Sequence, residues 1–287
     1  MKKILITGAN SYIGTSFERY INKKFPTEFS IDTLDMIGSS WRQHDFSKYD
    51  VVFHVAGIAH SDTKRVSQEL KAKYYAVNTD LAIETAQKAK LSGVKQFIFM
   101  SSMIVFGSKN DCITPHTKPN PDNFYGDSKL QADIGIHKLE DDTFKVASIR
   151  PPMIYGYGSK GNYPILARFA KRTPLFPQYN NKRSMLYIEN LCHFLVLIIE
   201  NNDTGYFYPQ NAEYVNTSNM VYQIALNSGK HLLLTKIFNP LIWLFRKHRI
   251  IKKVFGDMYY EQGMSKYTSQ YNAISFEQSI ERTENNE

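Results

Sequence analysis

The sequence predicts an α/β protein with a doubly wound parallel sheet and a smaller C-terminal lobe. Short apolar runs alternate with helix-like stretches through the first 150 residues, which is typical of a parallel sheet covered by helices on both faces. A glycine-bearing turn, Gly8 to Gly14, follows the first apolar run. Six glycines and prolines between residues 151 and 164 then end the alternation. We therefore expect a sheet domain over residues 1–150 and a lobe over 151–287, whose segments can interleave with the sheet.

Each expected element rests on its local pattern. The expected strands are short apolar runs: Lys3–Thr7, Phe29–Leu34, Val51–Ala56, Gln96–Ser101, Lys145–Ile149 and Ser184–Tyr187. The expected helices have helical periodicity: Ser11–Lys23, Tyr74–Ser92, Tyr125–Leu139, Ile165–Lys171 and Asn190–Glu200. The polar tail Glu277–Glu287 is expected to fray.

Composition places the chain among soluble globular proteins, since 43% of its 287 residues are apolar and 22% are charged. The excess of 35 Lys and Arg over 27 Asp and Glu gives a net charge of +8, which suits anionic ligands. No interleaved basic and aromatic module is present, so we expect no nucleic acid partner. The two cysteines, Cys112 and Cys192, lack metal-ligand spacing. We therefore expect no metal site and a reducing, cytoplasmic location.

One segment, Leu232–Phe255, is both apolar and basic and has two interpretations. As an interfacial helix it would lie against an anionic membrane. As a helix of the lobe it would pack its leucine and isoleucine face inward. Because Asn239-Pro240 interrupts the helical pattern, we favour the packed helix over peripheral membrane contact.

The turn from Thr7 to Gly14 predicts a dinucleotide-binding site of the Rossmann type. It joins the first strand to the first helix, where free backbone N–H groups and the positive helix end favour a pyrophosphate. Gly8 permits the tight turn, and Gly14 permits close approach of helix and strand. Ser11 replaces the usual middle glycine, and at negative φ its hydroxyl can still bond the phosphate. The predicted cofactor residues of this turn are Gly8, Ser11, Tyr12, Ile13 and Gly14.

Acidic residues some 20 positions past the glycines bear on the choice between NAD and NADP. The second strand ends near Asp32 and Asp35, where a carboxylate would hold the adenosine ribose hydroxyls and repel a 2′-phosphate. We therefore favour NAD, with Asp35 as the ribose ligand, and leave NADP open. Asp45 and Phe46 would bracket the adenine ring; the alternative is an ordinary turn and packing residue.

Tyr125 and Lys129 are the strongest candidates for catalysis. Four residues apart on a helix, their side chains share one face. An ammonium beside a phenol favours the phenolate, so a group with a reference pKa of about 10 can exchange protons near neutrality. Such a pair can move a proton on and off an alcohol oxygen while a hydride is transferred. Ser102 precedes the pair and belongs to the same pattern.

Over about its first 190 residues the chain resembles the extended short-chain dehydrogenase/reductases that act on nucleotide sugars. The resemblance is carried by several motifs in the family's order: Thr7-Gly8…Gly14, His54-Val-Ala-Gly57, Asn78, Phe99-Met-Ser-Ser-Met-Ile-Val-Phe-Gly107, Tyr125-x-x-x-Lys129, Arg150-Pro-Pro-Met-Ile-Tyr-Gly156 and Arg183-Ser-Met-Leu-Tyr-Ile-Glu-Asn-Leu191.

The resemblance implies a role for each matching residue. Ser102 would bond the reacting sugar oxygen, Tyr125 would be the acid/base, and Lys129 would tune Tyr125 and hold the nicotinamide ribose. The cofactor would also be lined by Ala56, Gly57 and Pro151.

The resemblance also implies substrate residues and an oligomer. Arg183 matches the arginine that grips the substrate diphosphate, a task suited to a guanidinium fork. Ser101 and Asn162 are the other predicted substrate residues. The family often pairs subunits through two helices each, here Tyr74–Ser92 and Tyr125–Leu139, so we expect a homodimer.

The residues after Ser102 distinguish the reactions of this family. Sugar 4,6-dehydratases carry an Asp-Glu pair there, whereas Met103-Ile104 cannot exchange protons. Reduction of a 4-keto sugar or 4-epimerisation remains. Met153 replaces the asparagine that contacts the diphosphate in epimerases, and we recognise no C-terminal Arg-x-Gly-Asp segment. Both observations favour a reductase.

Through Arg150-Pro-Pro-Met-Ile-Tyr-Gly156 and Lys182-Arg-Ser-Met-Leu-Tyr-Ile188, the chain also resembles reductases of capsular polysaccharide pathways. This resemblance implies the leading hypothesis, an NAD(P)-dependent reductase of the 4-keto group of a UDP-linked 6-deoxy-hexosamine in surface (capsule) polysaccharide biosynthesis. The alternative is a UDP-hexose or UDP-HexNAc 4-epimerase with tightly bound NAD. A non-catalytic nucleotide sensor is disfavoured, because such proteins usually lose the tyrosine that is present here as Tyr125.

Overall fold

The computed structural model describes residues 1–58 and 67–286. His60, a weaker substrate candidate from its loop position, lies outside the described residues. The chain divides into two compact units. The first comprises Met1–Ser108, Thr117–Pro151 and Cys192–Tyr208, and the second comprises Lys109–His116, Pro152–Leu191 and Pro209–Glu287. Residues 192–208 thus belong to the sheet unit, although they follow Pro151 in the sequence.

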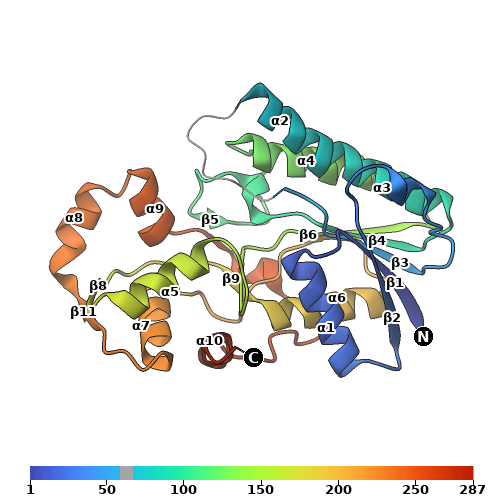
Figure 1. Cartoon of the computed structure of the whole chain (residues 1–287). Coiled ribbons are helices and arrows are strands. Elements are labelled where there is room, and N and C mark those ends of the chain that lie inside the picture. The colour runs from blue at the N-terminus through green and yellow to red at the C-terminus, as the bar shows by residue number, and fades with distance from the viewer. Residues whose placement is uncertain (59–66, 287) are drawn as a thin grey trace. The chain divides into compact units, whose positions relative to one another are not determined.

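A six-stranded parallel sheet forms the centre of the first unit, in the order β10-β6-β4-β3-β1-β2 (Figure 1). Its strands are β1 (Lys2–Thr7), β2 (Phe29–Leu34), β3 (Val51–His54), β4 (Gln96–Met100), β6 (Lys145–Ile149) and β10 (Gly205–Phe207). All five neighbouring pairs are parallel. The predicted α/β fold with a Rossmann-like sheet is confirmed. The three-residue strand β10 is an addition that its short pattern did not indicate.

Helices cover both faces of this sheet (Figure 1). They are α1 (Tyr12–Lys24) and α6 (Ile188–Asn201) on one face, and α2 (Gln68–Tyr75), α3 (Leu81–Leu91) and α4 (Phe124–His137) on the other. The helix predicted over Tyr74–Ser92 begins earlier and is divided. A π-helical turn, η2 (Ala76–Asp80), joins α2 to α3, and such turns occur frequently at functional sites. Two 3₁₀ turns complete the unit: η1 (Ser40–Gln43) and η3 (Met103–Phe106).

Apolar side chains fill both sides of the sheet. Toward α3 and α4, Val52 and Phe97 are fully buried together with small helix residues such as Ala86, which let the helices approach closely. Toward α1, the rings of Phe17 and Phe53 meet edge to face with centroids 5.4 Å apart. Each such side chain contributes about 1.5–3 kcal/mol by leaving water, so this packing holds the carboxyl ends of the strands in place.

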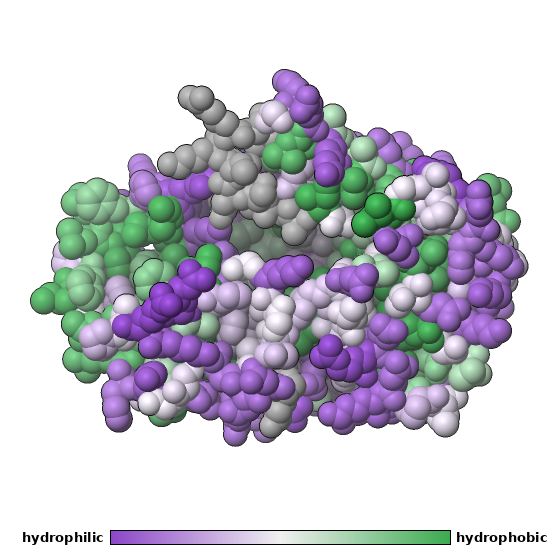
Figure 2. Space-filling view, viewed as in Figure 1, coloured by the Kyte–Doolittle hydropathy of each residue, from purple (hydrophilic) through white to green (hydrophobic). Residues whose placement is uncertain are grey.

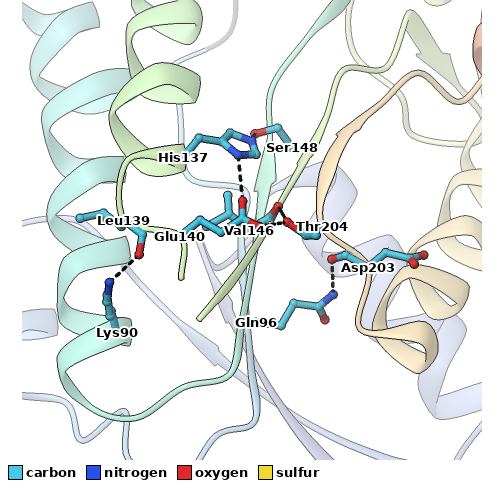
Figure 3. Close-up of polar contacts among 9 residues, drawn as sticks. All are labelled: Lys90, Gln96, His137, Leu139, Glu140, Val146, Ser148, Asp203 and Thr204. Carbon is cyan, nitrogen blue, oxygen red and sulfur yellow. Dashed lines mark hydrogen bonds and ion pairs between the residues drawn. The ribbon is translucent and has the colours of Figure 1, made fainter. Parts of the chain in front are cut away.

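Side-chain hydrogen bonds attach the edge strand β10 to its neighbours (Figure 3). Thr204 Oγ1 donates to the Val146 carbonyl at 2.8 Å and also to the carboxylate of Glu140. Gln96 Nε2 donates to the Asp203 carbonyl at 3.0 Å. These bonds supplement a backbone ladder only three residues long.

The second unit contains three two-stranded parallel sheets, β7-β9, β8-β11 and β12-β5. Its strands are β5 (Cys112–Ile113), β7 (Met153–Tyr155), β8 (Leu175–Pro177), β9 (Met185–Tyr187), β11 (Leu233–Thr235) and β12 (Tyr259–Tyr260). Its helices and 3₁₀ turns are α5 (Asn162–Arg172), α7 (Thr217–Asn227), η4 (Lys236–Phe238), α8 (Asn239–Leu244), α9 (Arg249–Phe255), η5 (Gln262–Ser265) and α10 (Phe276–Glu284).

Two expectations for the second unit were wrong. Most of the described part of the tail is helical and not frayed: Ser275 and Gln278 form a capping box at the start of α10 (Phe276–Glu284), and Ile280 is fully buried. In the segment Leu232–Phe255, Pro240 lies in the first turn of α8, and the helical pattern is interrupted later, between Leu244 and Arg249. Contrary to expectation, the leucine and isoleucine side chains of this segment do not pack inward. Only Leu232 and Ile242 among them are buried. Within the described ranges, no helix has the length and apolar character needed to cross a membrane.

Candidate active site

A pocket of about 840 Å³ opens in the first unit where β1, β2 and β3 end. In parallel sheets this edge is where dinucleotides bind. Its wall includes five of the predicted cofactor residues: Gly8, Ser11, Asp35, Ala56 and Gly57.

The glycine turn has the geometry that close approach of a dinucleotide requires. Gly8 has φ +114°, and a Cβ there would lie 2.6 Å from the Ala56 nitrogen, so only glycine fits. A Cβ at Gly14 would lie 3.1 Å from the Ile6 side chain, so this glycine brings α1 onto β1. Ser11 has φ −71°, and its Oγ caps α1 by accepting from the Gly14 N–H at 3.1 Å. Its own hydroxyl hydrogen is thereby left to donate to a ligand.

Tyr12 and Ile13 are the first residues of α1 and do not line the pocket with their side chains. The Tyr12 hydroxyl is buried without a hydrogen-bond partner among the described residues, and burial raises its pKa. The backbone N–H groups of a first helical turn have no intrahelical partner. Tyr12 and Ile13 would therefore contribute to cofactor binding through their backbone N–H groups.

The structure distinguishes the two acids near the end of β2. Asp35 lines the pocket, and its Oδ1 accepts from the Ile37 N–H at 2.9 Å. Asp32 does not line it; its carboxylate accepts from the Tyr49 hydroxyl at 2.7 Å and lies 3.5 Å from the Lys48 ammonium. Asp35 therefore remains the predicted ribose ligand.

The expected adenine bracket of Asp45 and Phe46 is not formed by their side chains. Phe46 is fully buried in the hydrophobic core, and the Asp45 carboxylate accepts from the Ser47 N–H at 2.9 Å. Neither residue lines the pocket, whereas Trp41 and Arg42 do. Trp41 and Arg42 were not predicted as cofactor residues, because they lie in the short turn η1, which carries no sequence motif.

Ser102 and Tyr125 meet through their side chains, which are hydrogen-bonded. Ser102 follows β4 and caps η3, with its Oγ accepting from the Ile104 N–H at 3.3 Å. Tyr125 stands in the first turn of α4. A Cβ at Gly126 would lie only 2.8 Å from the Ile104 carbonyl oxygen, so Gly126 lets α4 approach closely enough for the two hydroxyls to meet.

The electrostatics of Tyr125 differ from the expectation. Burial raises its pKa, the bond from Ser102 lowers it, and nearby Tyr74 raises it. The predicted lowering by an adjacent ammonium is therefore wrong for this arrangement, in which Ser102 is the group that favours the phenolate. Burial is the stronger influence, so the net pKa lies above the ordinary value.

Lys129 is directed toward the end of β4. Its Nζ donates to the Met100 carbonyl at 2.9 Å and lies 4.7 Å from the centre of the Phe99 ring. Burial lowers its pKa to about 8, and the carboxylate of Asp133 partly opposes that shift. A buried amine with this pKa can change its charge close to neutral pH.

Asn78 hydrogen-bonds both to α4, next to Lys129, and to the pocket wall at Ile58. A Cβ at Gly57 would lie 3.2 Å from Lys129 Nζ and 3.1 Å from Asn78 Oδ1. Asn78 Oδ1 also accepts from the Ile58 N–H at 2.8 Å, and its Nδ2 donates to Ser128 at 3.1 Å. The buried Asn78 amide therefore links the backbone at Gly57–Ile58 to α4. Asn78 itself is positioned by the π-helical turn η2.

Ser101, a predicted substrate residue, is directed into the protein interior instead. It is 4% exposed, and its Oγ donates to Asp133 Oδ2 at 2.8 Å. Arg150 Nε donates to the same oxygen at 3.0 Å. Pro151 does lie beside the Ser102 turn, because its carbonyl accepts from the Met103 N–H at 2.9 Å.

The substrate candidates of the second unit are only partly brought together. Arg183 Nη1 donates to the Gly256 carbonyl at 2.9 Å; burial lowers its pKa and Asp257 opposes that shift. Gly256 and Asp257 belong to the wall of a pocket of about 390 Å³, which Arg246 and Lys252 also line. Asn162 begins α5 and does not line this pocket.

The Gly256-Asp257 segment lies near the C-terminus of the second unit. Val254 stands two positions before Gly256, so this segment lacks the arginine of an Arg-x-Gly-Asp motif and the expected absence of that motif stands. The Lys182 N–H donates to Asp257 Oδ1 at 2.7 Å, which puts the segment next to Arg183.

A Rossmann-type sheet, a glycine turn bordering a large pocket and a bonded Ser–Tyr pair define an NAD-dependent enzyme of the short-chain dehydrogenase/reductase class. The chain belongs to the NAD dependent epimerase/dehydratase family, whose family model matches residues 4–208. Its cofactor is accordingly NAD or NADP, and Gly8, Ser11 and Asp35 fit such a group.

Individual relatives cover most of the chain. The UDP-glucose 4-epimerase of Vibrio cholerae is 29% identical over 280 residues, which is 89% of this chain and 83% of the relative. The N-acetyl-alpha-D-glucosaminyl-diphospho-ditrans,octacis-undecaprenol 4-epimerase of Escherichia coli O157:H7 is 26% identical, over 71% of this chain and 65% of its own.

Solved structures show the same fold. A UDP-glucuronic acid 4-epimerase from Bacillus cereus in complex with NAD superimposes with a TM-score of 0.75 at 16% identity, over 99% of this chain and 97% of its own. A dTDP-4-dehydrorhamnose reductase from Clostridium acetobutylicum gives 0.74 at 17% identity, over 98% of each chain. At such identities the likeness concerns the fold alone.

Proposed function

We propose that the protein is an NAD-dependent 4-epimerase of a UDP-linked sugar. The observation that carries the proposal is the hydrogen-bonded pair Ser102–Tyr125, which shares the end of β4 with Lys129. The 29% identity to a UDP-glucose 4-epimerase across 89% of the chain supports the reaction class. This choice reverses the preference for a reductase drawn from the sequence.

Bound NAD would supply the acceptor and donor of the C4 hydride. Tyr125 takes the proton of the sugar 4-hydroxyl as the C4–H bond breaks, and returns it when the hydride comes back to the other face of C4. Ser102 has one hydroxyl hydrogen, which in the substrate complex would be donated to this sugar oxygen instead of to Tyr125. That hydrogen bond would stabilise the alkoxide character that develops there. Lys129, whose pKa is about 8, supplies positive charge beside this oxygen in its protonated form.

Arg183, which bonds Gly256 in the wall of the 390 Å³ pocket of the second unit, would hold the UDP diphosphate together with that pocket. The wall of that pocket has three cationic residues, Arg246, Lys247 and Lys252, against two carboxylates, Asp111 and Asp257. Tyr179 and Phe255 supply aromatic faces. Guanidinium and ammonium groups suit a diphosphate, and aromatic faces suit a uracil ring.

A reductase of a UDP-linked 4-keto-6-deoxy-hexosamine in surface polysaccharide synthesis is the second candidate. It is favoured by Met153, which stands where epimerases carry an asparagine that contacts the diphosphate. The missing arginine of an Arg-x-Gly-Asp segment, where Val254 precedes Phe255-Gly-Asp257, also supports this candidate. Either enzyme could act as a homodimer through α2, α3 and α4.

To test the proposal, the purified protein is incubated with UDP-glucose or UDP-N-acetylglucosamine without added cofactor. Formation of the C4 epimer is followed by NMR. Formation of the 4-epimer supports the proposal, and Tyr125→Phe should abolish it. Stoichiometric oxidation of NADH at 340 nm with a UDP-4-keto sugar, and no epimer, would establish the reductase instead. If neither assay shows a reaction, both candidates are contradicted.

A further inference from the structure

The second unit carries a patch of exposed apolar side chains on η4, α8 and the start of α9. The α8 patch comprises Ile237, Leu241, Trp243, Leu244 and Ile250, which are 56–74% exposed. Figure 2 shows apolar residues gathered at the end of the molecule where Figure 1 labels α8. Single exposed apolar residues are ordinary on protein surfaces, but a contiguous group of this kind marks an interaction site.

The chain around the α8 patch is strongly cationic. Residues 230–256 contain seven Lys and Arg and no Asp or Glu. The remaining residues contain 28 Lys and Arg against 27 Asp and Glu, because the whole chain has 35 and 27. Nearly all of the net charge of +8 is therefore concentrated in these 27 residues.

Charge decides which partner fits the α8 patch. A second copy of the chain would bring another seven cations against the first, so self-association there is opposed. An anionic bilayer offers both complements, an acyl layer for the apolar side chains and headgroup charges for the cations. Trp243 has the amphipathic ring that is enriched at membrane interfaces. Arg246 lies 4.3 Å from the centre of this ring, and its Nη1 donates to the Trp243 carbonyl at 2.9 Å.

We propose that the α8 patch docks this protein onto the surface of an anionic lipid bilayer. The helices α8 and α9 have six and seven residues, so the contact is a shallow insertion of side chains into the interface. This inference goes beyond the proposed function, since it concerns where the enzyme works and not what it converts.

The test is co-sedimentation of the full-length protein with vesicles of phosphatidylcholine alone or with 30–40% phosphatidylglycerol, roughly the composition at which anionic surface potential becomes substantial. We expect binding to the anionic vesicles, little to the neutral ones, and a loss of binding with added salt. Equal binding to both, or binding to neither, overturns the proposal.

Variants separate the apolar and the cationic contributions. Trp243→Ser with Leu244→Ser should weaken vesicle binding at least tenfold, because two side chains no longer enter the interface. Arg249→Gln with Lys253→Gln should weaken it by about 25-fold, at about fivefold for each cation. Matched controls elsewhere are Leu91→Ser and Lys23→Gln, which should leave binding unchanged. Circular dichroism and thermal unfolding establish that each variant is folded.

Two measurements distinguish insertion of the α8 patch into a bilayer from contact with a second copy of the chain. Trp41 is 1% exposed and Trp243 is 60% exposed, so a vesicle-induced blue shift of tryptophan emission that Trp243→Phe removes reports insertion of this ring. Self-association that the Trp243→Ser and Leu244→Ser changes abolish would instead assign the α8 patch to a second copy, and would overturn the proposal.

Discussion

The side chains of Ser102 and Tyr125 are hydrogen-bonded, and this bond is the contact that moves the Tyr125 pKa down against the upward effect of burial. Burial therefore favours the protonated form of the Tyr125 phenol, and the hydrogen bond with Ser102 partly opposes this effect. The contact depends on the close approach of α4 to η3, which Gly126 permits.

Ser102→Ala should raise the Tyr125 pKa further and reduce kcat by about 100-fold, the cost typical of removing a donor to a developing oxyanion. Oxidation of the 4-hydroxyl needs deprotonated Tyr125, so the rising limb of log kcat/KM against pH should move to higher pH. Ser102→Thr keeps a hydroxyl and should restore the limb. A loss of rate with no movement of the limb would show that Ser102 does not tune Tyr125.

Lys129→Met should stabilise the protein at neutral pH while removing activity. The folded pKa of Lys129 is about 8, below the unfolded value of about 10.4. Below pH 8 both states are charged and the folded state bears the cost of burial. This cost is relieved between pH 8 and 10.4, as the folded state loses its proton first.

The expected gain for Lys129→Met is roughly 3 kcal/mol below pH 8, less the hydrogen bond lost at the Met100 carbonyl. It should vanish above pH 10.4. Urea unfolding of both proteins across pH 6.5–10.5 measures it, with Lys138→Met as a control on the end of α4. A difference independent of pH would mean that Lys129 is not buried as a cation.

Local pattern was sufficient for the glycine turn and for five of the six strands of the sheet. The strand Lys145–Ile149, which is buried over its last four residues, has the bounds that its apolar run indicates, because a parallel sheet covered on both faces requires such runs. The same holds for Gly8, whose φ of +114° only glycine adopts readily.

Side-chain direction and long-range contacts could not be predicted in this way. Ser101 and Ser102 are neighbours, yet Ser101 bonds buried Asp133 while Ser102 meets Tyr125. Phe46 was assigned to the adenine site and belongs to the core. Gly256-Asp257 lies beside Arg183, more than 70 positions earlier, and no local pattern reports such a contact.

Asp35→Ser should change the cofactor preference toward NADP. The carboxylate of Asp35 lines the pocket and would repel a 2′-phosphate, so its removal should shift the ratio of NAD to NADP affinity by tenfold or more, roughly the effect of one nearby like charge. Titration of each oxidised cofactor by calorimetry measures the ratio. Asp32→Asn is the matched control, because Asp32 bonds Tyr49 outside the pocket wall. If this control shifts the ratio and Asp35→Ser does not, Asp32 is the ribose ligand.

Asp133→Ala should destabilise the protein by about 3–5 kcal/mol, because it leaves the guanidinium of Arg150 buried without its counter-charge. Their side chains are 0% and 5% exposed. Ser101→Ala removes one hydrogen bond to the same carboxylate and should cost about 1.5–3 kcal/mol. Because Ser101 faces this pair, its variant should leave the KM for the UDP sugar unchanged; urea unfolding and steady-state kinetics measure the two effects. A raised KM with unchanged stability would return Ser101 to the substrate site and contradict the interior position described above.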